Sequence, residues 1–263
     1  MSKMSGIKLV ASDLDGTILL NGAQSVDESL IRTIEELVDR GIIFAPASGR
    51  QWVSLARLFQ PVSDKLLLIA DNGAIVKYKG ETLVKTPLDR EFALQVIRDA
   101  YNMPNCEVLV SGEDTAYIKP KTEAYHHRMT KVVNYKTTMV QNFTDIKEDI
   151  LKVAICDMTG IQNSQAHFFD LWSGDAAVTV SGDMYLDVMD KRVSKGFAME
   201  MVQQKLGIKP DECMAFGDNF NDCEMLDAVE HSYVMTGAVD EVKRHGKYIA
   251  EHVESVIRRE LLK

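Results

Sequence analysis

The sequence has no long hydrophobic run and little cysteine, and each shortage argues against a class of protein. No stretch approaches the roughly 20 consecutive apolar residues of a transmembrane helix, so we expect no membrane span. The N-terminal residues 1–6 are polar and lack the apolar core of a signal peptide. The four cysteines form no CxxC pair of the kind found in zinc or redox sites. These absences favour a cytoplasmic protein with reduced thiols.

Positive charge is also in deficit, which limits the expected partners. The 263 residues contain 39 acidic and 30 basic side chains, a formal net charge of −9. This balance argues against broad electrostatic binding to nucleic acid or to an anionic membrane, although a local basic patch can still hold an anionic substrate. The chain contains neither an internal repeat nor a low-complexity tract. Its length fits one large domain or two smaller ones.

Short apolar strands alternate with amphipathic helices at both ends of the chain. The first part has predicted strands at 8–12, 42–45 and 66–70, and predicted helices at 27–40 and 52–59. The last part has predicted helices at 193–206, 222–228, 239–245 and 251–262, and predicted strands at 213–216 and 232–235. Repeated strand–helix–strand order predicts an open parallel sheet with helices on both faces, an α/β fold.

The middle of the chain has more strands than helices. Strands are predicted at 107–110, 115–118, 151–156, 177–181 and 185–189, and helices at 90–101, 122–130 and 161–172. Such a run of strands is typical of an α+β module with an antiparallel sheet. We therefore expect an α/β core formed by residues 1–83 and 189–263, with an α+β domain inserted at residues 84–188.

Polar clusters follow the predicted core strands, where open α/β sheets bind their ligands. Four of them are Asp13-Leu14-Asp15-Gly16-Thr17, Ser48-Gly49-Arg50, Asp71-Asn72-Gly73 and the run from Gly217 to Asp222. A fifth, Lys195-Gly196, opens a predicted helix. Because the carboxyl ends of parallel strands meet at one edge of a sheet, the clusters are expected to converge on a single site.

The first cluster has the side chains for phosphoryl transfer. Carboxylate oxygens of Asp13 and Asp15 are ligands that Mg²⁺ prefers. Asp13 is a candidate nucleophile that would form an aspartyl-phosphate, and Asp15 a candidate general acid and base. Gly16 permits the turn after the strand, and Thr17 offers a hydroxyl to an anion. A pair of solvated loop aspartates with a turn glycine is the alternative interpretation.

The second cluster and the lysine supply donors and positive charge. The Ser48 hydroxyl and the Gly49 N–H are candidates to bind phosphoryl oxygens, although an ordinary helix N-cap explains them as well. Arg50 is a candidate phosphate ligand that would otherwise lie along the surface. Lys195 would neutralise phosphoryl oxygens and the Asp13 carboxylate, whereas a lone lysine before a glycine is usually solvated.

The last cluster completes an oxygen-rich site. Asp218 is a candidate metal ligand. Asp222 is a candidate to orient the waters around a metal, and Asn221 to donate to a phosphoryl oxygen or to contact Lys195. An acidic first turn of a helix explains Asp222 on its own but explains the pair of aspartates less well.

The five clusters, in this order, resemble the motifs of the haloacid dehalogenase (HAD) superfamily. Within it the chain is similar to the Cof-type phosphatases with a C2-type (IIB) cap, which lies between the second and third motifs. About 144 residues separate Arg50 from Lys195, whereas 32 separate Asp15 from Ser48. The resemblance also covers the Asp-Asn-Gly segment, in which Asp71 stands where the family more often has Glu.

The resemblance implies a Rossmann-like core with a mobile cap, and Mg²⁺-dependent hydrolysis of small phosphate monoesters through an intermediate on Asp13. It implies that Asp15 is the acid and base, and that Mg²⁺ is held by the Asp13 side chain, the Asp15 backbone carbonyl and the Asp218 side chain. The phosphoryl group would be held by Ser48, Gly49 and Lys195, and positioned by Asn221.

Substrate choice is expected to depend on the inserted domain. Candidate residues are the polar run from Tyr125 to Arg128, with a solvated helix face as the alternative, and the strand residues Tyr185 and Asp187. The expected partner is a small phosphorylated metabolite. Two alternatives to a phosphatase are a phosphomutase of the same superfamily and a non-catalytic sugar-phosphate-binding protein. A protein that only binds its ligand does not need both a nucleophile and an acid, so the presence of Asp13, Asp15, Lys195 and Asp218 argues against that alternative.

Overall fold

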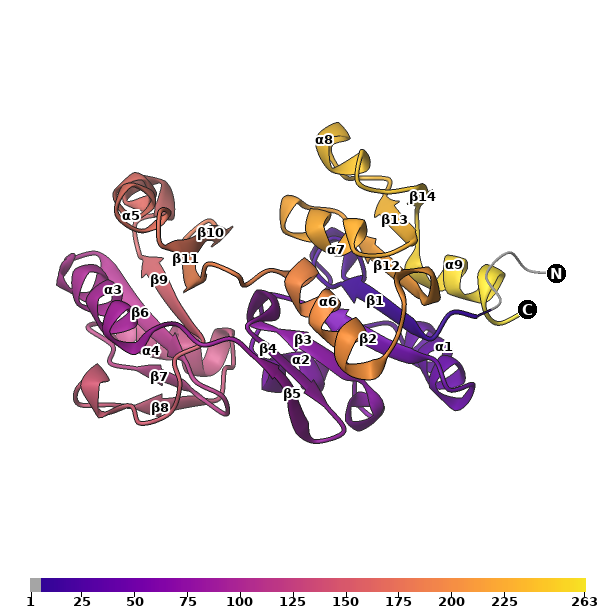
Figure 1. Cartoon of the computed structure of the whole chain (residues 1–263). Coiled ribbons are helices and arrows are strands. Elements are labelled where there is room, and N and C mark those ends of the chain that lie inside the picture. Colours follow the sequence, from indigo (N-terminus) through magenta and orange to yellow (C-terminus); the bar gives the residue numbers. More distant parts are fainter. Residues whose placement is uncertain (1–5) are drawn as a thin grey trace. The chain divides into compact units, whose positions relative to one another are not determined.

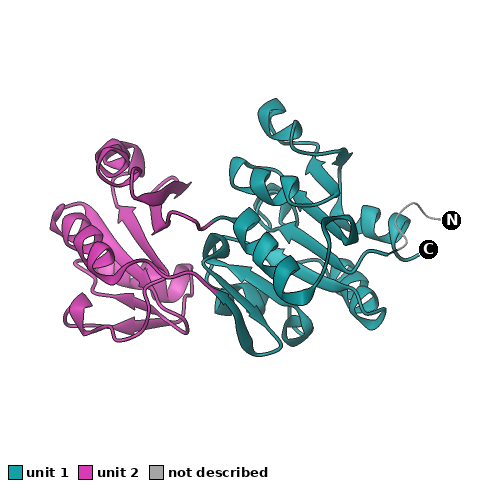
Figure 2. Cartoon of the chain, in the orientation of Figure 1, with its two compact units in different colours: residues 1–84, 194–263 teal, residues 85–193 magenta. Residues whose placement is uncertain are grey.

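Residues 6–263 of the chain, as described by a computed structural model, form two units with separate hydrophobic cores (Figures 1 and 2). Unit 1, here called the core, consists of the described residues up to Val84 together with Ser194–Lys263, and unit 2, here called the cap, is Lys85–Val193. The cap extends beyond the expected end at residue 188, since its last strand continues to Asp190. No helix in the described part of the chain combines the length and apolarity of a membrane span.

The core contains an eight-stranded sheet in the order β14-β13-β12-β1-β2-β3-β4-β5. Its strands are β1 (Leu9–Asp13), β2 (Ile43–Ala47), β3 (Leu67–Ala70), β4 (Ile75–Tyr78), β5 (Glu81–Lys85), β12 (Cys213–Gly217), β13 (His231–Met235) and β14 (Tyr248–Ala250). The strands from β14 to β3 are parallel, and β4 runs antiparallel to β3. Parallel strands are buried on both faces, which explains their nearly continuous apolar sequences.

Helices cover both faces of this sheet, as Figure 1 shows. One face packs against α1 (Glu28–Asp39), α2 (Trp52–Leu58) and α9 (Val253–Glu260). The other packs against α6 (Lys195–Leu206), α7 (Cys223–Asp227) and α8 (Asp240–Lys243). The predicted α/β class with a parallel sheet is therefore confirmed.

Three core strands were not predicted. The hairpin of β4 and β5 turns at Lys79 and Gly80, both with positive φ angles of 52° and 81°. Two consecutive positive φ angles suit a tight hairpin turn, but Lys-Gly is a weaker sequence signal than Asn-Gly. The third strand, β14, has only three residues, and two of them are exposed, so its apolar pattern is too short to detect.

The cap contains a six-stranded sheet in the order β10-β11-β9-β6-β7-β8. Its strands are β6 (Cys106–Ser111), β7 (Ala116–Ile118), β8 (Thr137–Met139), β9 (Lys152–Asp157), β10 (Ala176–Gly182) and β11 (Tyr185–Asp190). All neighbours are antiparallel except β7 and β8. The predicted α+β class of the inserted module is confirmed.

Helices also lie on both faces of the cap sheet. One face packs against α3 (Arg90–Asn102) and α5 (Gln165–Trp172), and the other against α4 (Glu123–His127). The helix expected at 122–130 is interrupted, because α4 ends at His127 and a π-helical turn, η4 (Arg128–Val132), follows it.

Single 3₁₀ turns connect several elements of both units. They are η1 (Leu20–Gly22), η2 (Ser63–Lys65), η3 (Asp71–Gly73), η5 (Phe143–Asp145), η6 (Ile161–Asn163), η7 (Pro210–Glu212) and η8 (Phe220–Asp222). Two of them, η3 and η8, lie at the ends of core strands and carry residues of the predicted site.

Candidate active site

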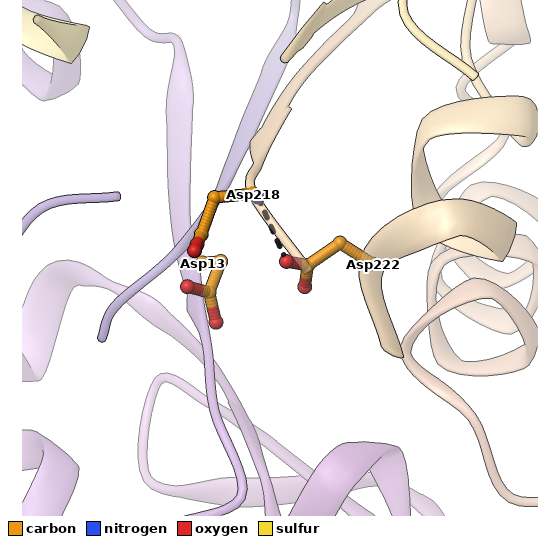
Figure 3. A group of neighbouring side chains, drawn as sticks. All are labelled: Asp13, Asp218 and Asp222. Carbon is orange, nitrogen blue, oxygen red and sulfur yellow. Dashed lines mark hydrogen bonds between the residues drawn. The ribbon is translucent and has the colours of Figure 1, made fainter. Parts of the chain in front are cut away.

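Two neighbouring strands bring together aspartates that are about two hundred positions apart in the sequence. Strand β1 ends at Asp13, and its parallel neighbour β12 ends one residue before Asp218. Asp222 follows on η8. Each of the three residues offers a carboxylate oxygen, and these oxygens all lie within 4.8 Å of one another (Figure 3). The carboxyl edge of the sheet therefore concentrates negative charge at one point.

Lys195 reaches this point from the first turn of α6. The helix begins after Ser194, whose side chain accepts a hydrogen bond from the N–H of Phe197. The Lys195 Nζ donates to Asp13 Oδ1 and, over 2.6 Å, to Asp222 Oδ1. Lys195 is only 1% exposed, and a buried ammonium group requires such partners.

Asp222 uses both of its carboxylate oxygens within the protein. Oδ1 accepts from Lys195, and Oδ2 accepts from the backbone N–H groups of Asp218 and Asn219 at 3.0 and 3.1 Å. A Cβ atom at Gly217 would lie 2.5 Å from the Asp222 Cβ, so only glycine permits this approach. Asp222 thus shapes the loop and holds the lysine, while Asp13 and Asp218 retain oxygens for a ligand.

The Asp218 side chain is oriented by the loop after β1. Thr17 Oγ1 donates to Asp218 Oδ1 over 2.7 Å. Gly16 has a φ of +98°, and a Cβ there would lie 2.3 Å from Asp218 Oδ2. The Thr17 hydroxyl, expected to face an anion, donates here to a carboxylate instead. Gly16 is therefore needed both for its backbone conformation and for the space it leaves.

The electrostatics of the cluster fit a divalent cation. Burial raises the pKa of Asp13 to about 7, although Lys195 opposes this shift. Burial also raises the pKa of Asp218, against the hydrogen bond from Thr17. Burial alone would lower the pKa of Lys195, but Asp13 and Asp222 outweigh it and raise that pKa. Crowded carboxylates with one ammonium partner are stabilised in their ionised form by a metal ion.

The loop after β2 is fixed by the Asp-Asn-Gly segment, η3. The backbone N–H of Asn72 donates to Ser48 O, and that of Asp71 donates to Arg50 O, each over 3.0 Å. The Ser48 hydroxyl accepts from the Arg50 N–H at 3.2 Å. A Cβ at Gly49 would lie 3.1 Å from Asn72 Oδ1. Asn72 therefore holds the predicted phosphate-binding loop through its backbone N–H, and its side chain lies close to Gly49.

Arg50 and Asp15 form a bidentate ion pair. Arg50 Nε lies 3.1 Å from Asp15 Oδ2, and Nη2 lies 2.6 Å from Oδ1. The Asp15 side chain is 56% exposed, so this carboxylate remains accessible to solvent. The Asn221 side chain is exposed on η8 and has no hydrogen-bond partner among residues 6–263.

One contact that supports the site carries no sequence signal of its own. Ser194 Oγ donates to Glu224 Oε2 on α7. A Cβ at Gly196 would lie 2.4 Å from the Glu224 Cβ, so α6 and α7 approach closely at this glycine. Gly196 belongs to the Lys195-Gly196 cluster, but nothing in the local sequence of Glu224 marks it as the partner of that glycine.

Comparisons with known proteins place these features in a wider group. The model of the haloacid dehalogenase-like hydrolases matches residues 10–256. The chain is 26% identical over 245 residues to the 5-amino-6-(5-phospho-D-ribitylamino)uracil phosphatase YbjI of Escherichia coli (strain K12), covering 93% of this chain and 90% of that one. It is 28% identical over 239 residues to the HMP-PP phosphatase of Enterobacter sp. (strain 638), covering 89% and 86%.

A solved structure from Eubacterium rectale supports the same grouping. It matches 97% of this chain and 99% of its own, with 30% identity and a TM-score of 0.87. The likeness therefore extends over both units of the chain and is not confined to the motif-bearing loops.

Proposed function

Because the chain belongs to the haloacid dehalogenase-like hydrolase family, we propose that it hydrolyses phosphate monoesters of small metabolites through an aspartyl-phosphate intermediate. One observation carries this proposal: the buried Asp13 carboxylate accepts a hydrogen bond from the Lys195 ammonium group, and its ligand oxygen lies within 4.8 Å of carboxylate oxygens of Asp218 and Asp222. A nucleophilic carboxylate, a fixed cation and free oxygen ligands are what phosphoryl transfer to an aspartate requires.

The proposed metal ligands are the side chains of Asp13 and Asp218 and the backbone carbonyl of Asp15. Bound Mg²⁺ would supply positive charge to the phosphoryl oxygens as a Lewis acid. Asp222 is not assigned as a direct ligand, since Lys195 and two backbone N–H groups already occupy its oxygens. Its proposed part is to hold Lys195 and the Asp218 loop in place.

The reaction consists of two transfers of one phosphoryl group. Asp13 attacks phosphorus, the bond to the ester oxygen breaks, and Asp15 gives a proton to the leaving alcohol. Water then attacks the aspartyl-phosphate, Asp15 takes its proton, and phosphate and the Asp13 carboxylate are released. Lys195 offsets the negative charge of the phosphoryl oxygens in both steps.

The remaining candidates would bind the phosphoryl group directly. We assign this part to the Ser48 hydroxyl, the Gly49 N–H and Asn221, in agreement with their family positions. Arg50 forms a bidentate ion pair with Asp15. Its guanidinium group would therefore bind a phosphoryl group beside the proposed acid. Donors fixed before the substrate arrives need no reorganisation during the reaction.

The similar phosphatases support a class of substrate but do not select one compound. The two named phosphatases act on different phosphorylated compounds at nearly equal identity to this chain, so we propose a small phosphorylated metabolite without choosing one. We also propose a cytoplasmic location, because all four cysteines are free and thiols stay reduced there.

The test is phosphate release from a panel of small phosphate esters, with Mg²⁺ and with EDTA. We expect Mg²⁺-dependent phosphate release from the wild type and a loss of turnover by at least a thousandfold in Asp13→Asn. The control Asp211→Asn, at an exposed aspartate outside the site, should release phosphate at the wild-type rate. Turnover retained by Asp13→Asn would exclude the nucleophile assignment. Isomerised ester without free phosphate would indicate a mutase, and binding without turnover would indicate a sensor.

A further inference from the structure

A polar hollow lies on the core at the edge of the sheet opposite the Asp13 site. Its volume is about 510 Å³, which is in the range of small-molecule sites. Its lining includes Ser232 at the start of β13 and residues 244–247, which lead into β14. Both strands run parallel to β12, so their amino ends lie away from the carboxyl edge that carries Asp218. All lining residues belong to the core, and the hollow is therefore a separate cavity within one unit.

Most charged side chains of this hollow are already paired within its wall. His245 Nδ1 lies 2.8 Å from Asp227 Oδ2, and Lys247 Nζ lies 2.7 Å from Glu230 Oε1. The backbone N–H of Lys247 donates to Ser232 Oγ over 3.2 Å. These contacts fasten the loop before β14 to the end of α7 and the start of β13. The wall is therefore formed before any ligand arrives, which lowers the entropic cost of binding.

Two opposite charges in the same hollow have no partner in the protein. Glu200 lies on α6, and Arg244 follows the last residue of α8. Both residues line the hollow and are exposed. Among residues 6–263, neither side chain forms a hydrogen bond or an ion pair, and the two do not pair with each other. One cation and one anion of the hollow are thus available to a ligand.

The charge balance argues against a ligand with charge of one sign. A simple anion at Arg244 would also meet the carboxylates of Glu200, Asp227 and Glu230, which line the same hollow. A simple cation at Glu200 would meet Arg244 and Lys247. Complementary potentials favour a ligand that presents a negative group to Arg244 and a positive group to Glu200.

The rest of the lining offers apolar surface to such a ligand. Leu226 and Val229 line the hollow and belong to the hydrophobic core beneath it. Pro210 and Ala228 add apolar atoms to the same wall. Burial of an uncharged part of the ligand against this wall would contribute to affinity. The hollow therefore suits a small molecule with one anionic, one cationic and one uncharged part.

We propose that this hollow binds a free α-amino acid, with its carboxylate at Arg244 and its ammonium group at Glu200. The planar guanidinium group matches the two oxygens of a carboxylate, and the Glu200 carboxylate accepts hydrogen bonds from an ammonium group. The side chain of the amino acid would lie on the apolar wall. This proposal concerns binding alone and does not depend on the proposed phosphatase function.

Calorimetric titration of the full chain with each of the twenty proteinogenic amino acids tests for the site. For the amino acid that binds most tightly, the carboxamide lacks the negative charge and the N-acetyl derivative lacks the positive charge. We expect each derivative to bind about tenfold more weakly or worse, because each loses a charge-assisted hydrogen bond. No binding of any amino acid, or equal affinity for the three forms, would overturn the proposal.

Matched variants assign the binding to the hollow. Arg244→Met and Glu200→Gln should each raise the Kd by about tenfold or more, for the same reason. Lys205→Met and Glu241→Gln remove the same charges from exposed positions of α6 and α8 outside the hollow and should leave the Kd unchanged. Equal losses in all four variants would indicate an effect of net charge and would overturn the proposal.

Two further measurements fix the orientation and the place of the ligand. In Arg244→Met the carboxamide should bind as tightly as the amino acid itself, because the partner of the carboxylate is gone. Asp13→Asn should bind the amino acid as the wild type does. An affinity lost in Asp13→Asn and kept in Arg244→Met would place the ligand at the candidate active site and reject the hollow.

Discussion

Lys195 and Asp222 are joined by a hydrogen bond of 2.6 Å between Nζ and Oδ1, and both side chains are almost completely buried. The other oxygen of Asp222 holds the backbone of the loop that carries Asp218. A single carboxylate thus fixes the position of a cation and the position of a candidate metal ligand. This arrangement accounts for the complete burial of an aspartate that would otherwise belong in water.

Replacement of Asp222 should therefore damage both stability and activity. Asp222→Ala leaves Lys195 with one carboxylate and leaves two backbone N–H groups without their acceptor. We expect the free energy of unfolding to fall by about 3–5 kcal/mol, together with a large loss of kcat. Urea unfolding and phosphate release measure the two effects, with Asp211→Asn as the control. A variant as stable as the wild type would contradict the assigned role.

Gly16 offers a test of the space beside Asp218. Gly16→Ala places a Cβ 2.3 Å from Asp218 Oδ2, whereas Gly41→Ala, at a φ of +81°, meets no atom within 4 Å. Because alanine disfavours a positive φ, both variants should lose about 1 kcal/mol of the free energy of unfolding. We expect only Gly16→Ala to raise the Mg²⁺ concentration for half-maximal activity, by at least tenfold. The same Mg²⁺ requirement in both variants would show that the Asp218 side chain adapts freely.

The pKa of Asp13 predicts an unusual pH dependence for the metal-free protein. The carboxyl titrates near 3.8 when unfolded and, because of burial, near 7 when folded. Between these values the folded state keeps a proton that the unfolded state has lost. The contribution of Asp13 to the free energy of unfolding therefore falls as pH rises from about 4 to 7, and is constant above that range.

Urea unfolding in EDTA at several pH values measures this effect. The wild type should lose stability relative to Asp13→Asn as pH rises through the range, because asparagine cannot titrate. Added Mg²⁺ should stabilise the wild type more at pH 8 than at pH 5, since protons compete with the metal for the carboxylate. A stability difference independent of pH would exclude the raised pKa.

The cap has a buried ion pair of its own. Lys152 Nζ lies 3.3 Å from Asp187 Oδ2, and each side chain is 4% exposed. Loss of one partner leaves a buried charge, so Asp187→Leu should lower the free energy of unfolding by about 3–5 kcal/mol. The double variant Lys152→Met/Asp187→Leu should recover most of this loss, because two apolar side chains replace two charges. Thermal unfolding of the three proteins would measure the recovery, and additive losses would contradict it.

The architecture follows closely from local sequence patterns. Continuous apolar strands such as Leu67–Ala70 are buried on both faces, so their composition alone indicates a parallel sheet. The edge hairpin of β4 and β5 could not be predicted in this way, because its strands are partly exposed and Lys79-Gly80 is a weak sequence signal for a hairpin turn. The break between α4 and the π turn at Arg128 is likewise invisible, because the sequence there has ordinary helical spacing.

The residue types of the site were readable from the sequence, but their partners were not. Asp13, Asp15 and Lys195 stand out by their positions after a strand and at a helix start. Which side chain meets which depends on strand order: only the pairing of β1 with β12 puts Thr17 beside Asp218. The sequence thus determined the chemical groups available at the sheet edge, through short-range patterns of burial and turns. The tertiary structure alone decided how those groups pair, because hydrogen bonds between segments two hundred residues apart leave no mark on local sequence.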